Sequence, residues 1–510
     1  MDPQQYTRLV RRLELDSHAD PAAFRRRVML VSLGAYAVIV GTLALCVLLV
    51  GLAVRFALAA YLNAGVVKFA LLGAVFVVLP LVALALVLRT LFTRLAPPHG
   101  RPLTRDEAPA LFDMLDRMRA KLGGPGIDHV LIDDRYNAAI AQLPRFGLFG
   151  WHANYLTIGL PYLLGVPMKE MLATVAHEYG HICGNHGKFG AWVYRQRQVF
   201  VALYGQVREQ ADDNLFQRAV AAVLDRLMPY YNAYTFVLSR QNEYDADRTA
   251  SALVGTVANA QGLVRDALQS RWMAEEFWPT LLRHAERDAR PPFMPFAAMK
   301  TAFKAGYEQW ARPQVLAAAL AVRSSPHDTH PCLRERVDAT GEKAALPRPV
   351  DRPAADVLLP PELLRTLIRT FDDAWWEREG RHWEARHRQA SRARLRLTEL
   401  SARPLAELAL GDLQELALLR IELVGPAAGK DVLAYLLAQP GGPFPKAAYH
   451  YGCILLGEGD DEGLFHLEAA VAHDRSLADA ACDAGHAFLL RTRGERAAQL
   501  WMNGLLPRAA

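Results

Sequence analysis

Cysteine is scarce in this chain of 510 residues. The five cysteines are odd in number, lie far apart and form no C-x-x-C pair; they are Cys46, Cys183, Cys332, Cys453 and Cys482. This usage is not that of a disulfide framework, and it favours a reducing compartment.

The chain also lacks a strong excess of one charge. Its formal net charge is +5 at pH 7, which is small for this length, and the basic residues are scattered rather than gathered in a patch with interleaved aromatic residues. No segment resembles a nucleic-acid-binding module, so we expect no nucleic-acid partner. The length exceeds that of a single typical core and predicts two or more domains.

Charged residues are missing from two long segments near the N-terminus. Val28 to Val54 gives 27 uncharged residues and Phe69 to Leu88 gives another 20. Each run is long enough to cross a hydrocarbon core of about 30 Å, so the sequence predicts a two-span transmembrane hairpin over 28–88 with the lipid bilayer as a partner. A cleaved signal peptide fits poorly, because the first run is too long and a second follows directly. Buried core helices are the alternative.

The distribution of Lys and Arg predicts how this hairpin is oriented. Six arginines precede the first run, only Arg55 and Lys68 lie between the runs, and Arg89, Arg94 and Arg101 follow the second. By the positive-inside rule, the tail 1–27 and the chain after residue 88 lie in the cytoplasm. We therefore expect a multi-pass protein of the inner (plasma) membrane whose main domain faces the cytoplasm.

The most informative motif is His177-Glu178-Tyr179-Gly180-His181, a complete H-E-x-x-H. On a helix, His177 and His181 lie one above the other and can hold one metal ion between them. Glu178 then flanks the open position of the metal, where it can take a proton from metal-bound water and pass it to a leaving amine. Two histidines on a buried helix without a metal are the alternative.

A second acidic motif follows 62 residues after His181, with Glu243 and Asp247 on one helix face. A zinc site of two histidines and one carboxylate keeps a fourth position for water, which is the catalytic arrangement. Asp247 would accept the spare ring N–H of a ligand histidine and fix its tautomer. Taken alone, the same spacing also fits a solvated acidic face.

With these motifs the chain resembles the membrane zinc metalloendopeptidases that include the heat-shock protease HtpX, the CAAX prenyl protease and the periplasmic chaperone-proteases. The resemblance spans roughly residues 105 to 340 and rests on four motifs in order: Asn137-Ala138, His177 to His181, Glu243 to Asp247, and His330-Pro331 followed by Arg336. It implies a gluzincin with one Zn²⁺ per chain, in which His177, His181 and Glu243 are ligands, Glu178 is the general base and Asp247 orients a ligand.

The resemblance also implies roles for residues outside the ligand set. His330 would reach the active site and steady the substrate or the tetrahedral oxyanion, whereas a loop histidine before a proline is the alternative. Asn137 would contact the substrate backbone, with a local turn role as the alternative. Arg336 is a further candidate substrate-binding residue.

A short β-prone run, Tyr155 to Gly159, lies just ahead of the motif helix. By the resemblance it would be an edge strand that pairs with extended substrate through main-chain hydrogen bonds, so Tyr155 and Thr157 are candidate substrate-binding residues. An ordinary core strand is the alternative. The insertion 188–240 is interpreted as amphipathic helices that cover the cleft or lie on the bilayer.

Beyond the peptidase region, 346–357 is rich in proline and is interpreted as a linker. The stretch 375–398 with its tryptophans and arginines is interpreted as a solvated helix with one buried face, or as a functional basic surface. A shift of 33 residues then aligns positions such as Gly452 with Gly485 and Leu456 with Leu489. This period resembles tetratricopeptide-like helix pairs, which recruit protein partners or extend the structure.

These inferences give a mainly α fold with a cytoplasmic tail (1–27), two transmembrane helices (28–88), a zincin-like α+β peptidase domain with a small sheet (89–345), a linker (346–357) and a C-terminal helical region (358–510). The predicted function is a membrane-anchored zinc metalloendopeptidase that cleaves membrane or membrane-proximal, misfolded proteins. A non-catalytic zinc-stabilised scaffold that acts through its C-terminal region is one alternative. A prenyl-protein processing enzyme is the other, although it would call for several more spans.

Overall fold

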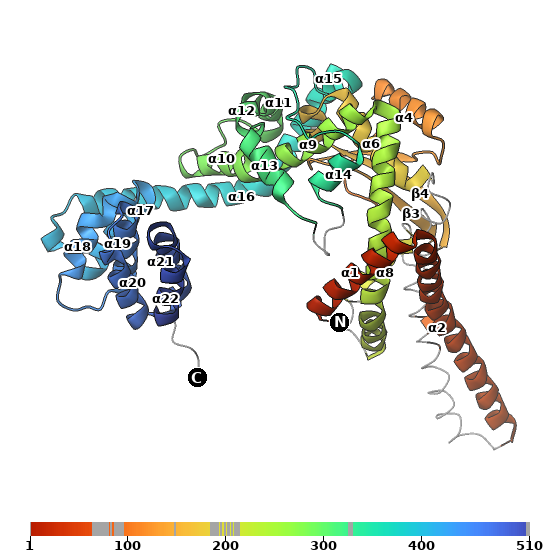
Figure 1. The fold of residues 1–510 in the computed structure, drawn as a ribbon, viewed down its shortest axis with the longest axis horizontal. Helices are drawn as coiled ribbons and strands as arrows, with labels where there is room; N and C mark the ends of the chain where they lie inside the picture. Colours follow the sequence, from red (N-terminus) through yellow and green to blue (C-terminus); the bar gives the residue numbers. More distant parts are fainter. Residues whose placement is uncertain are drawn as a thin grey trace. The chain divides into compact units, whose positions relative to one another are not determined.

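The computed structural model (Figure 1) describes residues 2–63, 96–146, 149–183, 215–324 and 330–505, with short pieces at 81, 84–85, 193, 196–197, 200, 204–205 and 208. The chain forms two compact units. The first comprises 1–280 and 293–377, and the second comprises 281–292 and 378–510. Both are built mainly from helices, which confirms the predicted predominance of α structure.

The first unit contains a single sheet within the described ranges. Its strands are β1 (Arg101–Leu103), β2 (His129–Asp133), β3 (Ala138–Phe146) and β4 (Phe149–Gly159). Their spatial order is β1-β2-β4-β3, in which β2 and β4 are parallel and the other two pairs are antiparallel. Inward residues such as Leu156 and Ile158 are fully buried, so β4 forms the hydrophobic centre of the sheet.

Helix α6 (Met168–Cys183) follows the sheet and carries the histidine motif. It begins directly after Pro167, a residue that suits a helix start, and has Glu170 in its first turn. The sequence Gly184-Asn185-His186-Gly187 predicts the end of this helix, and it lies outside the described residues. Helix α8 (Leu215–Val254) carries the acidic motif and packs along α6. Gly180 makes this approach possible, because a Cβ there would lie only 3.2 Å from Ala246 Cα and 3.3 Å from Thr249 Cβ.

The first unit contains further helices besides α6 and α8. Two precede the sheet, α1 (Pro3–Ala19) and α2 (Pro21–Asn63), and α4 (Pro109–Leu122) lies between its first two strands. The others are α5 (Leu160–Gly165), α9 (Thr256–Trp272), α10 (Trp278–Arg283), α11 (Pro295–Ala305), α12 (Tyr307–Trp310), α13 (Pro313–Ala321), α14 (Leu333–Ala339) and α15 (Ala355–Leu358).

The proline-rich stretch interpreted as a linker is bound to this unit. The Ala354 backbone N–H donates to Val166 O at 2.8 Å, and the Arg265 guanidinium donates to Arg348 O at 2.8 Å. Tyr307 Oη also donates to Pro347 O at 2.9 Å. The stretch therefore packs against the residue pair just before α6 and against side chains of two other helices of this unit. The domain boundary predicted there stays a prediction.

The predicted transmembrane hairpin is not reproduced in the described residues. The first run, 28–54, lies within α2, and most of the second run, 69–88, falls outside the described residues. Among the helices that the structure describes, none meets the combined length and hydrophobicity of a membrane span. The insertion predicted at 188–240 is described mainly from residue 215 onward, where it forms the first half of α8.

The second unit is entirely helical in its described part. The long helix α16 (Pro361–Ser401) leads into it, and its members are α17 (Leu410–Leu423), α18 (Lys430–Leu437), α19 (Pro445–Glu458), α20 (Glu462–His473), α21 (Ala478–Arg493) and α22 (Glu495–Leu505).

The predicted internal repeat corresponds to two helix pairs, α19 with α20 and α21 with α22. Gly452 and Gly485 occupy equivalent places in the first helix of each pair. A Cβ at Gly452 would lie 2.8 Å from Gly463 O, and one at Gly485 would lie 2.2 Å from the Trp501 ring. Each glycine thus lets the second helix pack closely, which is the physical reason for the period.

Candidate metal centre

Three side chains from two helices converge at one point in the first unit. His177 and His181 extend from α6 and Glu243 extends from α8, and one ligand atom of each lies within 4.8 Å of the others. His177 Nε2 is 3.4 Å from Glu243 Oε2, and His181 Nε2 is 3.4 Å from Glu243 Oε1. All three side chains are at most 6 % exposed.

These distances fit a metal ion held between the three groups. With bonds of about 2.0–2.1 Å to zinc, neighbouring ligand atoms of a tetrahedron lie about 3.3–3.4 Å apart. Two imidazoles and one carboxylate are also a donor set that zinc accepts while keeping a position open. The described residues therefore have the spacing and the donor set of a site that could hold a metal ion such as zinc.

The orientation of His177 is fixed from behind by Asp247. Its Nδ1 lies 2.8 Å from Asp247 Oδ1, so the ring donates this proton to Asp247 and its Nε2 faces Glu243. Arg336 on α14 in turn donates from Nε to Asp247 Oδ2 at 2.9 Å and from its terminal nitrogen to Asp247 Oδ1 at 2.7 Å. Arg336 therefore contacts the aspartate behind His177, and its candidate substrate-binding role stays a prediction.

Glu178, also on α6, lies beside the cluster, and its side chain extends toward strand β3. One of its carboxylate oxygens is 4.0 Å from His177 Nε2, and the other accepts the backbone N–H of Ile140 at 3.4 Å. Burial, opposed by His177 and reinforced by the Glu243 carboxylate, raises the pKa of Glu178 above its ordinary value. This carboxylate is thus placed to accept a proton next to the three candidate ligands.

His177, His181 and Glu243 differ in their charge states. Burial and the Arg336 charge oppose protonation of His177, but hydrogen bonds with Asp247 and Glu243 raise its pKa to about 9, so a metal that binds this ring would displace a proton. Burial and the neighbouring His177 lower the pKa of His181 to about 3, so this ring is neutral and offers a lone pair. Burial opposes ionisation of Glu243, but hydrogen bonds with His177 and His330 hold its pKa well below the ordinary value. A neutral imidazole and an ionised carboxylate are the forms that bind zinc.

His330 reaches the site, as the resemblance implies. Its Nδ1 is 2.6 Å from Glu243 Oε2, while more than half of its side chain is exposed. It therefore stands at the rim of the cluster. A substrate or oxyanion role for it stays a prediction.

The predicted edge strand is wrong in its position. β4, which contains Tyr155 and Thr157, pairs with β2 on one side and β3 on the other, so its main chain is not open. The open edge next to Glu178 belongs to β3, which has only β4 as a neighbour among the described strands. The sequence did not indicate Ile140, because this residue acts through its backbone N–H, which donates to Glu178 and is the same for every residue type except proline.

A groove runs along this edge to the candidate site. It is about 490 Å³ in volume and is lined by His99, Arg135, Asn137, Ala139, Thr157 and Glu178, among others. Asn137 is exposed at its end, and its own Oδ1 accepts the Ala138 N–H at 2.8 Å. This bond fits the local turn role that the sequence offered as the alternative. Asn137 also lines the groove, and its substrate-binding role stays a prediction.

Comparison with known proteins agrees with this geometry. Residues 156–344 match the model of peptidase family M48. This part of the chain is similar to that family, which confirms the resemblance for the three motifs that lie within it. The matched region contains His177, His181, Glu243 and their partners Asp247 and Arg336. The similarity suggests a metallopeptidase with protein or peptide substrates. Searches of curated proteins and of solved structures returned no match.

Proposed function

We propose that this protein is a zinc-dependent endopeptidase that acts on proteins at a membrane. The observation that carries the proposal is the position of Glu178. Its carboxylate touches the ligand cluster on one side and, on the other, accepts a hydrogen bond from the open edge of β3. A proton acceptor between a metal site and a strand edge is the arrangement that peptide hydrolysis requires.

Strand β3 is suited to hold the substrate. Asn137 O accepts the Gly159 N–H at 2.8 Å, so residue 137 turns its polar groups toward β4. The alternation of an antiparallel pair then directs the main-chain groups of Ala138, Ile140 and Gln142 to the open edge. An extended peptide added there forms main-chain hydrogen bonds and lies across Glu178, which gives broad tolerance of sequence.

In the reaction, Glu178 takes a proton from water while the water oxygen attacks the scissile carbonyl carbon. The same carboxyl group then gives the proton to the leaving amine nitrogen as the C–N bond breaks. A zinc ion held by His177, His181 and Glu243 would polarise the scissile carbonyl and make water more acidic. His330, at the rim, steadies the oxyanion, and Asp247 with Arg336 keeps His177 in the binding tautomer.

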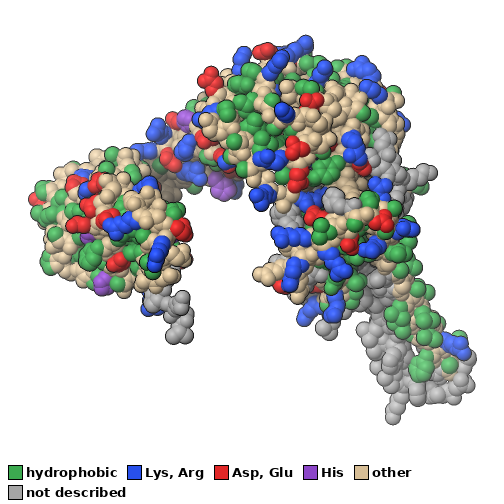
Figure 2. Space-filling view, viewed as in Figure 1, with side chains coloured by type: hydrophobic (Ala, Val, Ile, Leu, Met, Phe, Trp, Pro, Cys, Tyr) green, Lys and Arg blue, Asp and Glu red, His purple; other side chains and the backbone are tan. Residues whose placement is uncertain are grey.

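Membrane association is proposed from the N-terminal run. In the part of α2 that carries it, many large apolar side chains are exposed; they include Leu30, Leu33, Val40, Leu45, Leu48, Leu52 and Phe56 (Figure 2). Exposed apolar surface of this extent is costly in water and is covered when it meets lipid. The arginines that flank the run favour the cytoplasmic face of the inner membrane, and misfolded or membrane-proximal proteins are the proposed substrates.

The helix pairs of the second unit are proposed to recruit protein partners or substrates. Their unit length and pairing are those of helical repeats that bind peptides on a shared surface. Phe465 and Leu490 are exposed on these helices and offer apolar contacts.

The Glu178→Gln variant tests the proposed function in the full chain. We expect one zinc per chain to remain, measured by mass spectrometry, while cleavage of casein falls by about 10²–10⁴-fold because the general base is lost. Glu275→Gln, which changes an exposed carboxylate of the same unit, should leave both values unchanged. Cleavage retained in Glu178→Gln would exclude the mechanism, and a wild-type protein with zinc but no cleavage would favour the scaffold alternative.

A further inference from the structure

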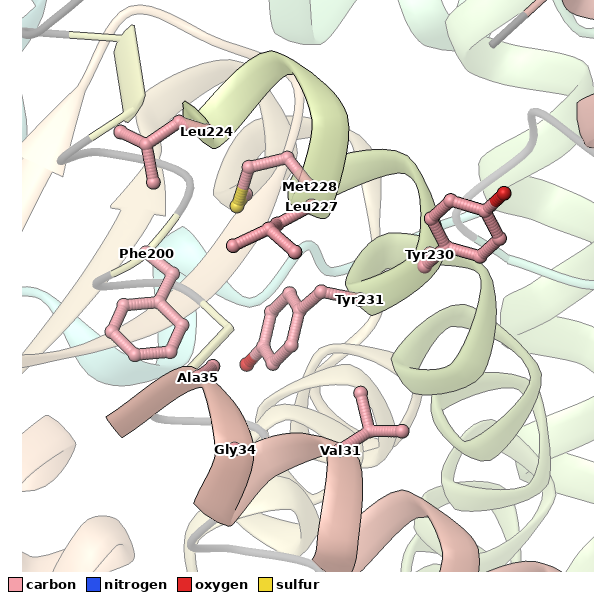
Figure 3. Close-up of a pocket in the computed structure, with 9 residues that line it drawn as sticks. All are labelled: Val31, Gly34, Ala35, Phe200, Leu224, Leu227, Met228, Tyr230 and Tyr231. Atoms are coloured by element: carbon pink, nitrogen blue, oxygen red, sulfur yellow. The ribbon is translucent and has the colours of Figure 1, made fainter. Parts of the chain in front are cut away.

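An apolar pocket lies between α2 and α8, away from the candidate metal centre. Its volume is about 310 Å³, at the lower end of the range for small-molecule sites. Val31 and Ala35 line it from α2, Leu224 and Met228 line it from α8, and Phe200 closes one side (Figure 3). Pro229 interrupts the hydrogen-bond ladder of α8 at this level.

One polar group inside this pocket has no partner. Tyr231 is only 3 % exposed, and its hydroxyl forms no hydrogen bond with any described residue. Figure 3 shows this hydroxyl turned toward the face of α2 that carries Ala35. A buried hydroxyl without a partner costs free energy, on the order of 1–3 kcal/mol. An acceptor oxygen brought by a ligand would remove that cost.

The pocket lies where the packing of α2 against α8 ends. Before it, Phe24 and Val28 of α2 pack on Ala233 and Val237 of α8. Beyond it, α2 continues with exposed apolar side chains, of which Val40 is 58 % exposed. The pocket is therefore continuous with the apolar surface that the bilayer is proposed to cover.

Basic side chains precede the pocket-lining residues on α2. Arg25 and Arg26 are exposed and form no ion pair with any described residue. They precede Val31 by five or six residues, which places them about 8–9 Å away along the helix and about 120–140° around it, so their long side chains must extend around α2 to meet a headgroup at the pocket entrance. An exposed arginine, Arg226, also adjoins the pocket on α8. Arginine binds phosphate oxygens through paired hydrogen bonds.

We propose that this pocket binds one acyl chain of an anionic membrane phospholipid. The chain fills the apolar space, the ester carbonyl accepts the hydrogen bond of Tyr231, and the phosphate meets Arg25 and Arg26. Occupancy of the site, and with it the packing of α2 against α8, would then depend on the lipid composition of the membrane. It rests on the proposed membrane association but does not depend on proteolysis.

Photolabelling of the full-length protein tests this site. The probe is phosphatidylglycerol with a diazirine on its acyl chain, as a minor component of phosphatidylcholine vesicles. We expect the label on peptides that contain residues 28–35 and 224–231. Gly34→Phe should lower labelling by about tenfold, because no atom lies within 4 Å of a Cβ there and the ring can enter the pocket. Gly41→Phe is the matched control, since a Cβ there also meets open space but outside the pocket.

Two further variants separate the parts of the site. Tyr231→Phe preserves the packing and should lower labelling by about fivefold, the equivalent of one hydrogen bond. Replacing Arg25 and Arg26 by Gln should abolish the preference for this probe over the matching phosphatidylcholine probe. Equal labelling of the Gly34→Phe and Gly41→Phe proteins, or labelling confined to other peptides, would overturn the proposal.

Separate assays distinguish this proposal from the proposed function. Vesicle flotation reports membrane association, casein cleavage reports the peptidase, and the labelled peptides report the pocket. A variant that floats and cleaves like the wild type but loses the label supports the pocket alone. Labelling by a diazirine fatty acid but not by the phospholipid would show that the ester and phosphate contacts are absent, and would overturn the proposal.

Discussion

Arg336 holds Asp247 through two parallel hydrogen bonds of 2.9 and 2.7 Å. Because Asp247 receives the Nδ1 proton of His177 at 2.8 Å, this pair orients a candidate ligand. The Arg336 side chain is only 17 % exposed, so its charge is directed into the site. The pair belongs to the scaffold that determines the geometry of the ligands.

We expect Arg336→Gln to lower zinc affinity by about 10–100-fold, the usual effect of losing a group that orients a ligand. Arg336→Lys should recover only part of this, since an ammonium cannot make the paired bonds. Competition with a fluorescent chelator measures the affinity. Arg334→Gln, an exposed change on the same helix, is the control. Unchanged affinity in Arg336→Gln would remove this arginine from the metal scaffold.

The open edge of β3 gives a second prediction. Ile140→Pro removes the outward N–H, which Glu178 accepts in the structure and which an added strand would take over. The change should lower kcat/KM for peptide cleavage by about tenfold, the loss of one main-chain bond. Ile140→Ala keeps the N–H and controls for the lost side chain. Ala139→Pro instead removes an N–H that faces β4 and should disrupt the sheet. Equal activity of Ile140→Pro and Ile140→Ala would mean that the substrate does not pair with this edge.

The sequence predicted the ligand cluster because helical spacing determines it locally. His177 and His181 share a face by their separation alone, and the pattern around Glu243 and Asp247 does the same on α8. Gly180 is small, as the motif sequence shows, and its lack of a side chain lets α8 come close. The contact of Arg336 with Asp247 spans 89 residues, and no local pattern encodes its geometry.

The order of the strands in the sheet also depends on contacts between distant parts of the chain, so it could not be predicted from local patterns. The alternation of Tyr155, Leu156, Thr157 and Ile158 fits an edge strand and an interior strand equally well, because both bury one face. What decides is the pairing of β4 with β2 and β3, which is set by long-range packing. The apolar run of α2 was evident in the sequence, yet hydropathy alone does not reveal the pocket against α8.

A buried ion pair at the start of α6 gives a third prediction. Arg265 Nε is 2.5 Å from Glu170 Oε2, and both side chains are at most 6 % exposed. Glu170→Ala leaves the arginine charge buried without its partner and should lower the free energy of unfolding by about 3–5 kcal/mol. Removing Glu275 from its exposed pair with Arg271 should cost less than about 1 kcal/mol.

Urea unfolding followed by tryptophan fluorescence measures these differences. The double variant Glu170→Leu with Arg265→Met replaces the pair by apolar groups and should be more stable than Glu170→Ala. A double variant as unstable as the single one would show that the bond from Arg265 to Arg348 O, rather than the charge pair, stabilises this region.

Asp266 on α9 gives a prediction about pH. Its Oδ2 accepts bonds from Tyr162 at 3.2 Å and Thr174 at 3.4 Å, while Oδ1 has no partner among the described residues. Burial, reinforced by the nearby Glu170 carboxylate, raises the pKa of Asp266 from 3.8 to about 7. Between these pH values the folded protein keeps a proton that the unfolded chain has released, so stability falls as pH rises through this window.

We expect Asp266→Asn to remove this part of the pH dependence, because an amide does not ionise. The measurement is the urea midpoint of the metal-free protein between pH 4.5 and 8, compared with the wild type. The histidines titrate in both proteins, so the difference between the two curves isolates Asp266. The wild type should lose stability relative to the variant steadily as pH rises between the unfolded pKa of 3.8 and the folded pKa of about 7, with no further loss above that value. Asp116→Asn, at an exposed position, should follow the wild-type curve. If the Asp266→Asn curve also runs parallel to it, Asp266 is already ionised in the folded protein at acidic pH, and Tyr162 and Thr174 bind a carboxylate there.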